Sequence, residues 1–161
     1  MKIVLAAVGT RMPGWVDTGF EDYAKRLPPA CRLTLREVPT AYRGAAGRKG
    51  AGAPAASIRR EGEGLLRAVP SGARVVALDE RGTVWSTRDL AERLGSWLAD
   101  GRDTALLAGG PDGLAPACRE RADLNWSLSR LTFPHGLVRV IVAEQVWRAW
   151  SLLNRHPYHR A

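Results

Sequence analysis

The chain has 161 residues, of which 45% are hydrophobic and 25% are charged. This composition is typical of one globular domain that is large enough to bury a core. No apolar run reaches the roughly 18 residues of a membrane span, and the run at residues 3–8 is too short for a secretory signal. We therefore expect a single domain over residues 1–161, located in the cytoplasm and without membrane contact.

The charge and the cysteines narrow the classes of partner and cofactor. The net charge is +8 and the pI is about 10.5, which favours a polyanionic partner such as RNA or DNA, although a generally basic proteome would give the same charge. Cys31 and Cys118 are far apart, with no CxxC or Cys/His spacing typical of zinc. We expect both to be reduced, buried thiols and predict no metal site.

The first part of the chain alternates predicted strands and helices. Residues 3–8 form a short apolar run typical of a buried strand. Apolar residues recur at helical spacing over 16–27, and Pro28-Pro29 ends that helix. Residues 32–38 alternate apolar and polar side chains, which predicts a second strand.

The segment 42–60 differs from its surroundings. It contains five basic residues, four glycines and no acid, so we expect a mobile basic loop. It is either a solvated insertion of variable sequence or a flexible clamp for RNA phosphates, which flexible cations can bind.

The second part continues the alternation. Ser86 and Asp89 have the spacing of a capping box and open a helix that Asp100-Gly101 ends. The other predicted elements are a helix marked by Ile58 and Val69, strands at 75–78, 104–108 and 127–133, a short helix after Pro116, and a final helix over 136–154. Strands separated by helices predict right-handed crossovers and a mostly parallel α/β sheet flanked by helices.

The final helix is apolar on nearly every side. Because an amphipathic surface helix keeps a polar face, we expect a second copy of the chain to cover this helix; burial within one chain is the alternative. Its one acid, Glu144, is expected to pair with Arg139, Arg148 or a loop amide, and a role as general base is the other interpretation.

Two segments at predicted strand ends are candidate ligand-binding segments. The first, Gly109-Gly110-Pro111-Asp112-Gly113, is either a tight turn or a loop whose amides a ligand approaches closely. It lacks the Gly-Lys-Ser/Thr of a P-loop and the three-glycine dinucleotide fingerprint. The second, residues 128–133, is either a core strand or a pocket wall whose backbone reads an adenine edge, with apolar side chains against the ring.

The C-terminal tail carries titratable side chains. His156 and His159 are three apart, but no third or fourth metal ligand is evident. The tail is therefore either a disordered polar terminus or a segment that folds over an anionic substrate.

Several motifs in a fixed order resemble the bacterial large-subunit rRNA methyltransferase H family of the SPOUT superfamily, over essentially the whole chain. The motifs are Ala7-Val8-Gly9-Thr10, Ala77-Leu78-Asp79 with Trp85, Gly109-Gly110-Pro111-Asp112-Gly113-Leu114, Trp126-Ser127-Leu128-Ser129, Leu131-Thr132-Phe133-Pro134-His135, Arg139-Val140, Ala143-Glu144-Gln145, Arg148-Ala149 and His156-Pro157-Tyr158-His159-Arg160. The segment 44–57 is longer and richer in glycine and alanine than the family pattern, which bears on RNA contacts in that loop.

The resemblance implies a SPOUT fold with a deep C-terminal trefoil knot, a knotted cofactor-binding part over about 74–161, and a homodimer. It also implies S-adenosylmethionine as methyl donor and methylation at N3 of pseudouridine 1915 in helix 69 of 23S rRNA, on assembled 70S ribosomes. Carried over by motif, the cofactor-binding residues are Leu78, Gly109, Leu128, Ser129, Arg130, Leu131, Thr132 and Phe133, and the catalytic residues are Tyr158, His159 and Arg160.

Within this reading, His159 and Arg160 orient and polarise the target base, and Tyr158 shapes the pocket. Three alternatives stay open at this point. They are a methyltransferase for another rRNA uridine, a basic module that binds the ribosome without catalysis, and a nucleotide-dependent oxidoreductase of doubly wound fold.

Overall fold

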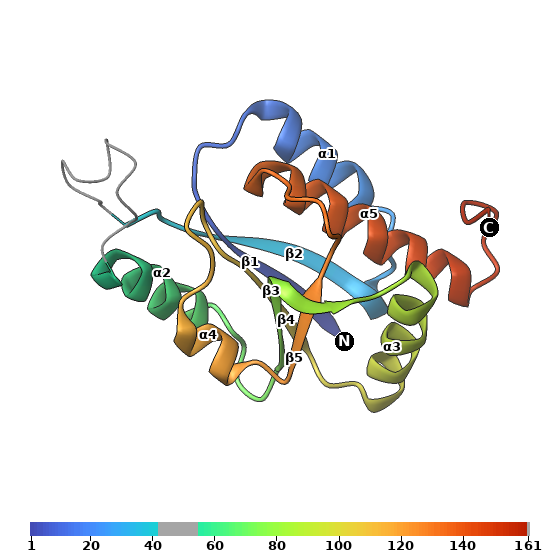
Figure 1. Cartoon of the computed structure of the whole chain (residues 1–161). Helices are drawn as coiled ribbons and strands as arrows, with labels where there is room; N and C mark the ends of the chain where they lie inside the picture. The colour runs from blue at the N-terminus through green and yellow to red at the C-terminus, as the bar shows by residue number, and fades with distance from the viewer. Residues whose placement is uncertain (42–54, 161) are drawn as a thin grey trace.

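A computed structural model describes residues 1–41 and 55–160. Five parallel strands form one sheet in the order β2-β1-β4-β3-β5, with helices on both faces (Figure 1). The predicted α/β class and parallel sheet are therefore confirmed. The elements are β1 Lys2–Val8, α1 Gly14–Ala24, a 3-10 turn Pro29–Cys31, β2 Arg32–Val38, α2 Ala55–Arg67, β3 Arg74–Val84, α3 Thr87–Asp100, β4 Thr104–Ala108, α4 Pro116–Arg121, β5 Leu124–Ser127 and α5 His135–Leu153.

The helices divide into two layers. Helices α1, α5 and α3 cover one face of the sheet, and α2 and α4 cover the other (Figure 1). Strand β1 shows why both faces need a layer: its residues from Ile3 to Val8 are all buried, and successive side chains of a strand point to opposite faces. Ile3 and Leu5 pack toward α5, whereas Ala6 and Val8 pack toward α2 and α4.

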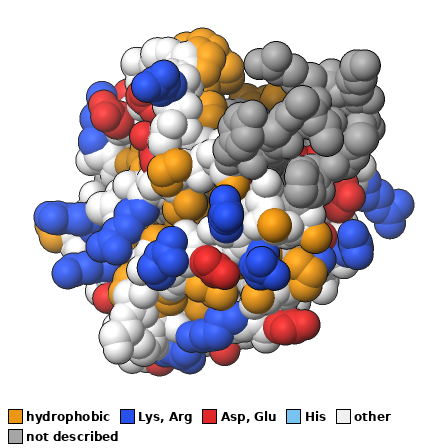
Figure 2. All heavy atoms as spheres, turned by 90° about the vertical axis from the view of Figure 1, so that its left-hand side faces the viewer, with side chains coloured by type: hydrophobic (Ala, Val, Ile, Leu, Met, Phe, Trp, Pro, Cys, Tyr) orange, Lys and Arg blue, Asp and Glu red, His pale blue; other side chains and the backbone are white. Residues whose placement is uncertain are grey.

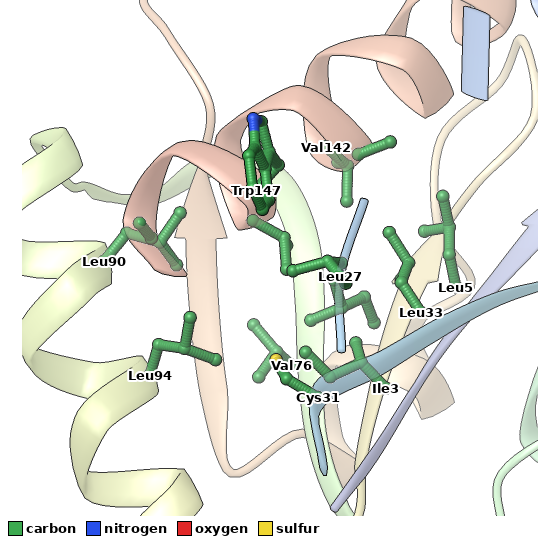
Figure 3. Close-up of a cluster of buried hydrophobic side chains, with 14 of the residues drawn as sticks. Ile3, Leu5, Leu27, Cys31, Leu33, Val76, Leu90, Leu94, Val142 and Trp147 are labelled. Carbon is green, nitrogen blue, oxygen red and sulfur yellow. The ribbon is translucent and has the colours of Figure 1, made fainter. Parts of the chain in front are cut away.

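The larger part of the core lies between the sheet and the layer of α1, α3 and α5. Figure 3 shows Leu90 and Leu94 of α3 and Val142 and Trp147 of α5 gathered over side chains of the sheet such as Val76. All five are at most 5% exposed. Burial of each large apolar side chain contributes roughly 1.5–3 kcal/mol, so this layer holds α5 firmly on the sheet.

Helix α3 begins and ends where the sequence predicts. The hydroxyl of Ser86 accepts a hydrogen bond from the Asp89 amide at 3.1 Å, and the Asp89 carboxylate accepts one from the Ser86 amide at 2.7 Å. The Ser86 amide and the Ser86 hydroxyl both donate to the Asp89 carboxylate, and these two bonds lower the pKa of Asp89. Gly101 ends the helix in the left-handed conformation at φ 71°.

Two sequence predictions differ from the structure. The predicted strand at 127–133 is wrong, because β5 ends at Ser127 and residues 128–134 form a loop. There the Ser129 hydroxyl accepts from the Leu131 amide at 3.0 Å, and such local bonds replace a strand ladder. The predicted loop 42–60 is wrong at its end, since α2 begins at Ala55; its residues 42–54 lie outside the described residues.

Arg139 of α5 ties this helix to the carboxyl edge of the sheet. Its guanidinium is fully buried and donates to the Glu37 carboxylate at 2.8 Å and to the Gly9 carbonyl at 2.7 Å. Both acceptors lie at or beyond the carboxyl ends of β1 and β2, the edge where open α/β sheets bind ligands.

No helix in the described part of the chain is long and apolar enough to cross a bilayer.

Candidate functional site

A cavity of about 770 Å³ opens at the carboxyl ends of β4 and β5, beside the part of β3 that follows its pairing with β4. Its walls come from residues 78–81 of β3, the loop after β4, the loop after β5 and the first turns of α2, α4 and α5. Among its lining residues are Leu78, Asp79, Arg81, Gly109, Gly110, Arg119, Leu128, Ser129, Leu131, Thr132, Phe133, His135 and Val138. Of the eight predicted cofactor-binding residues, all but Arg130 line this single cavity; Arg130 is exposed beside it.

The glycine-rich loop after β4 is a tight turn packed closely on itself. The Gly113 amide donates to the Gly110 carbonyl at 3.0 Å, and Gly113 has φ +83°, which favours glycine. A Cβ on Gly109 would lie 2.5 Å from the carbonyl carbon of Gly113, closer than real Cβ atoms come. The sequence allowed two interpretations of residues 109–113, a tight turn or a ligand-binding loop. The two are compatible, because the tight turn itself forms one wall of the cavity.

The loop 128–133 presents apolar side chains together with non-helical, non-strand backbone at the cavity. Leu128 and Phe133 are half-buried, and Leu131 is 73% exposed at the cavity. The Ser127 hydroxyl donates to the Ser129 carbonyl at 3.0 Å, which fixes the start of the loop. Such a wall suits a flat, largely apolar ring whose polar edge needs backbone partners.

A charged pair occupies another wall of the cavity. The Asp79 carboxylate lies 3.3 Å from Nη1 of Arg119, and the same nitrogen donates to the Leu114 carbonyl at 2.8 Å. The second oxygen of Asp79 accepts the Arg81 amide at 2.9 Å. Asp79 follows Leu78 directly in β3, so the charged pair adjoins the apolar wall.

The tail 156–160 folds back on α5 and does not line the cavity of its own chain. The Tyr158 hydroxyl donates to the Glu144 carboxylate at 2.9 Å. The Tyr158 ring lies under the guanidinium groups of Arg148 and Arg26, at 4.9 and 5.8 Å. Both ring nitrogens of His159 are buried and have no hydrogen-bond partner in the described chain.

Glu144 has the structural role that the sequence favoured. It accepts from Nε of Arg148 at 2.8 Å, whereas Arg139, the other predicted partner, pairs with Glu37. Burial and the hydrogen bond to Glu144 raise the pKa of Tyr158 to about 12, so its phenol stays protonated at neutral pH. Tyr158 is thus a donor rather than a base.

Comparison with known proteins identifies the family. The family model described as Predicted SPOUT methyltransferase matches residues 1–159. The chain is 56% identical to the ribosomal RNA large subunit methyltransferase H of Methylococcus capsulatus, over 99% of this chain and 100% of that protein. It is 54% identical to the protein of that name from Nitrosococcus oceani, over 100% and 99% of the two chains. The chain belongs to the methyltransferase H family of SPOUT methyltransferases.

A more distant likeness extends to solved structures. A methylase family protein from Neisseria gonorrhoeae superposes with a TM-score of 0.55 at 15% identity, over 91% of this chain and 80% of that one. A second methylase family protein, from Haemophilus influenzae Rd KW20, gives 0.54 at 15% identity, over 99% and 70%. At this identity, the likeness supports the fold alone.

Sequence reasoning singled out neither Arg119 nor His135 as a site residue, although both line the cavity of this family member. Asp79 and His135 were noted only as parts of motifs. The available signal was position: Asp79 ends an apolar strand run, and His135 opens the final helix. Among the described residues, no three His, Cys, Asp or Glu side chains are grouped to hold a metal ion.

Proposed function

We propose that this protein transfers a methyl group from S-adenosylmethionine to N3 of pseudouridine 1915 in helix 69 of 23S rRNA, within assembled 70S ribosomes. The observation that carries the proposal is the cavity at the carboxyl edge of the sheet, in a chain that is 52–56% identical over nearly its full length to large-subunit rRNA methyltransferases. Because the proposed substrate is the assembled ribosome, we infer that the protein acts in the cytoplasm.

The cavity residues fit the donor. The cavity volume of about 770 Å³ lies in the range of small-molecule sites. Leu128, Leu131 and Phe133 supply apolar surface for an adenine ring, and the backbone of the same loop supplies donors and acceptors for its edge. We assign Leu78, Gly109 and the run 128–133 to this cofactor, including Arg130 at the mouth.

The charge of the protein fits an rRNA substrate. The net charge is +8, and Figure 2 shows Lys and Arg side chains distributed over the face where α2 and α4 lie. A positive field strengthens association with RNA phosphates and accelerates it. A loop nucleotide of helix 69 suits the reaction, since only unpaired bases expose their ring edge to an enzyme.

We infer a homodimer in which the tail of one protomer completes the cavity of its partner. Trp15 in α1 is 58% exposed and Leu153 in α5 is 40% exposed, so apolar surface remains on this layer. Tyr158, His159 and Arg160 do not reach the cavity of their own chain, which supports a contribution across the dimer. The oligomeric state is measured by sedimentation at micromolar concentration, and a monomer would contradict this inference.

We also infer a deep trefoil knot within residues 74–161 of the single domain. Helix α4 packs with α2 on one face of the sheet, and α5 packs with α1 and α3 on the other. The chain between them must cross the carboxyl edge at 128–134, beside the loop 109–114, with which it shares the cavity. A crossing at that place is what a knot in this part of the chain requires.

In the proposed reaction the protein positions the methyl donor against the target base and accepts one proton. When bound, S-adenosylmethionine supplies a methyl group already activated by its positively charged sulfur. The pseudouridine loses its N3 proton before or during attack on that group. We assign this proton to the His159 imidazole of the tail, since histidine is the side chain that most often accepts a proton in catalysis. Arg160 stabilises the negative charge on the ring, and Tyr158, anchored to Glu144, shapes the pocket.

The deciding experiment is transfer of labelled methyl to ribosomes that lack the helix 69 methyl group, beside free large subunits and naked rRNA. Mass spectrometry then identifies the labelled nucleoside. We expect label at N3 of a pseudouridine with the assembled ribosome only. Label on another uridine would replace the target, and cofactor binding without label would also contradict it. Absence of both label and cofactor binding would favour a non-catalytic ribosome-binding module.

A further inference from the structure

We propose that Asp79 and Arg119 bind the amino acid end of S-adenosylmethionine, with Arg119 on its carboxylate and Asp79 on its ammonium group. The proposal rests on the proposed function and adds the residues that recognise this end of the donor.

The geometry of Arg119 leaves one edge of its guanidinium available. Nη1 is held by the Leu114 carbonyl at 2.8 Å and by Asp79 at 3.3 Å. Nε and Nη2 have no hydrogen-bond partner in the described part of the chain, and Arg119 is one of the residues that line the cavity. These two N–H groups are parallel, and together they match the two oxygens of a carboxylate. Arg119 is thus fixed through one nitrogen and free through the other two.

Asp79 supplies the complementary charge. Its side chain is 8% exposed and lines the same cavity, where the amide of Arg81 fixes one carboxylate oxygen at 2.9 Å. A carboxylate kept from water favours a cationic ligand group beside it. The pair therefore presents one negative and one positive group, as the zwitterionic end of an amino acid requires.

The same pair argues against an RNA phosphate at Arg119. A phosphate carries only negative charge and would meet the Asp79 carboxylate, whose oxygen lies 3.3 Å from Nη1 of Arg119. An amino acid end instead satisfies both residues. Asp79 also follows Leu78, a residue assigned to the cofactor, so one extended ligand in the cavity can contact the loop 128–133 and the charged pair together.

The test compares ligands that differ only in this end. S-adenosylhomocysteine carries the amino acid end, and 5′-methylthioadenosine lacks it, while both have a neutral sulfur. Isothermal titration calorimetry measures both, and S-adenosylmethionine itself, against the wild type, Arg119→Gln, Asp79→Asn and the control Arg121→Gln. Arg121 lies in the same short helix, pairs with Asp123 at 3.8 Å and does not line the cavity. Thermal unfolding verifies that each variant is folded.

We expect Arg119→Gln to weaken binding of S-adenosylhomocysteine and S-adenosylmethionine roughly 10- to 100-fold, the effect of losing a charge-assisted pair. Binding of 5′-methylthioadenosine should stay within about twofold, and Arg121→Gln should change none of the three. Asp79→Asn should show the same selectivity. Arg119→Lys keeps the charge but not the paired N–H groups, so its loss should be smaller.

Equal loss for all three ligands, or none, would overturn the proposal. If Arg119→Gln instead leaves all three affinities intact but raises the KM for ribosomes, Arg119 contacts RNA and the proposal is wrong. A wild type that binds none of the ligands would refute the proposed function as well, so the two failures are distinguishable.

Discussion

Replacing the buried Arg139 by methionine should destabilise the protein strongly. The guanidinium is fully buried and donates to Glu37 at 2.8 Å, to the Gly9 carbonyl at 2.7 Å and weakly to the Val8 carbonyl at 3.5 Å. Methionine would fill the space but leave the two close acceptors, Glu37 and the Gly9 carbonyl, without this donor. A hydrogen bond to a charged group contributes roughly 1.5–3 kcal/mol, and breaking a buried pair costs roughly 3–5 kcal/mol. Glu37 is 38% exposed and regains water, which favours the lower part of that range.

The expected decrease in the free energy of unfolding for Arg139→Met is therefore about 3–4 kcal/mol. For a chain of this size, such a loss lowers the Tm by roughly 6–16 °C. Urea unfolding followed by tryptophan fluorescence measures the change, with all variants at one protein concentration, because an oligomer's stability depends on concentration. Glu37→Gln is the matched control, since its amide oxygen still accepts from Arg139, and it should lose about 1 kcal/mol.

A decrease below about 1 kcal/mol for Arg139→Met would refute this reasoning, because the two acceptors would then be satisfied without the guanidinium. Equal losses for Arg139→Met and Glu37→Gln would also contradict it, since they would assign the whole effect to the ion pair and none to the Gly9 carbonyl.

Three further predictions concern the loop, the tail and the thiols. Gly109→Ala should weaken cofactor binding and cost roughly 1–3 kcal/mol of stability, because its Cβ would meet Gly113; Gly14→Ala, with open space around its Cβ, should change stability by less than about 0.5 kcal/mol. The pKa of Tyr158 is raised to about 12 from an ordinary 10.0. The stability that its protonated phenol contributes to the folded protein is therefore complete below pH 10 and is lost as the pH rises to 12. The difference in unfolding free energy between wild type and Tyr158→Phe should therefore shrink over that interval, and a constant difference would contradict the assignment. Burial raises the pKa of Cys31 to about 11 and also raises that of Cys118. Both thiols should therefore react slowly with a disulfide reagent at pH 8 in the native protein and rapidly in urea, where the chain is unfolded. Fast labelling of the native protein would contradict this expectation.

Local patterns predicted most elements because local chemistry decides them. The capping box of Ser86 and Asp89, the left-handed Gly101 and the buried run of β1 each depend on residues close in sequence. The fifth strand was mispredicted, because residues 128–133 have strand-like composition but their serine side chains bond the local backbone. The pairing of Arg139 with Glu37, across 102 positions, has no local signal.

The sequence by itself determined the family, the parallel α/β class and seven of the residues that line the cavity, because motifs and periodicity are properties of consecutive residues. Only the tertiary structure decided that Arg119 is held by the Leu114 carbonyl with a free edge in the cavity, and that the tail packs on Glu144 away from it. These relations depend on which elements the sheet order brings together, and no spacing along the chain encodes the direction in which a side chain enters a shared cavity.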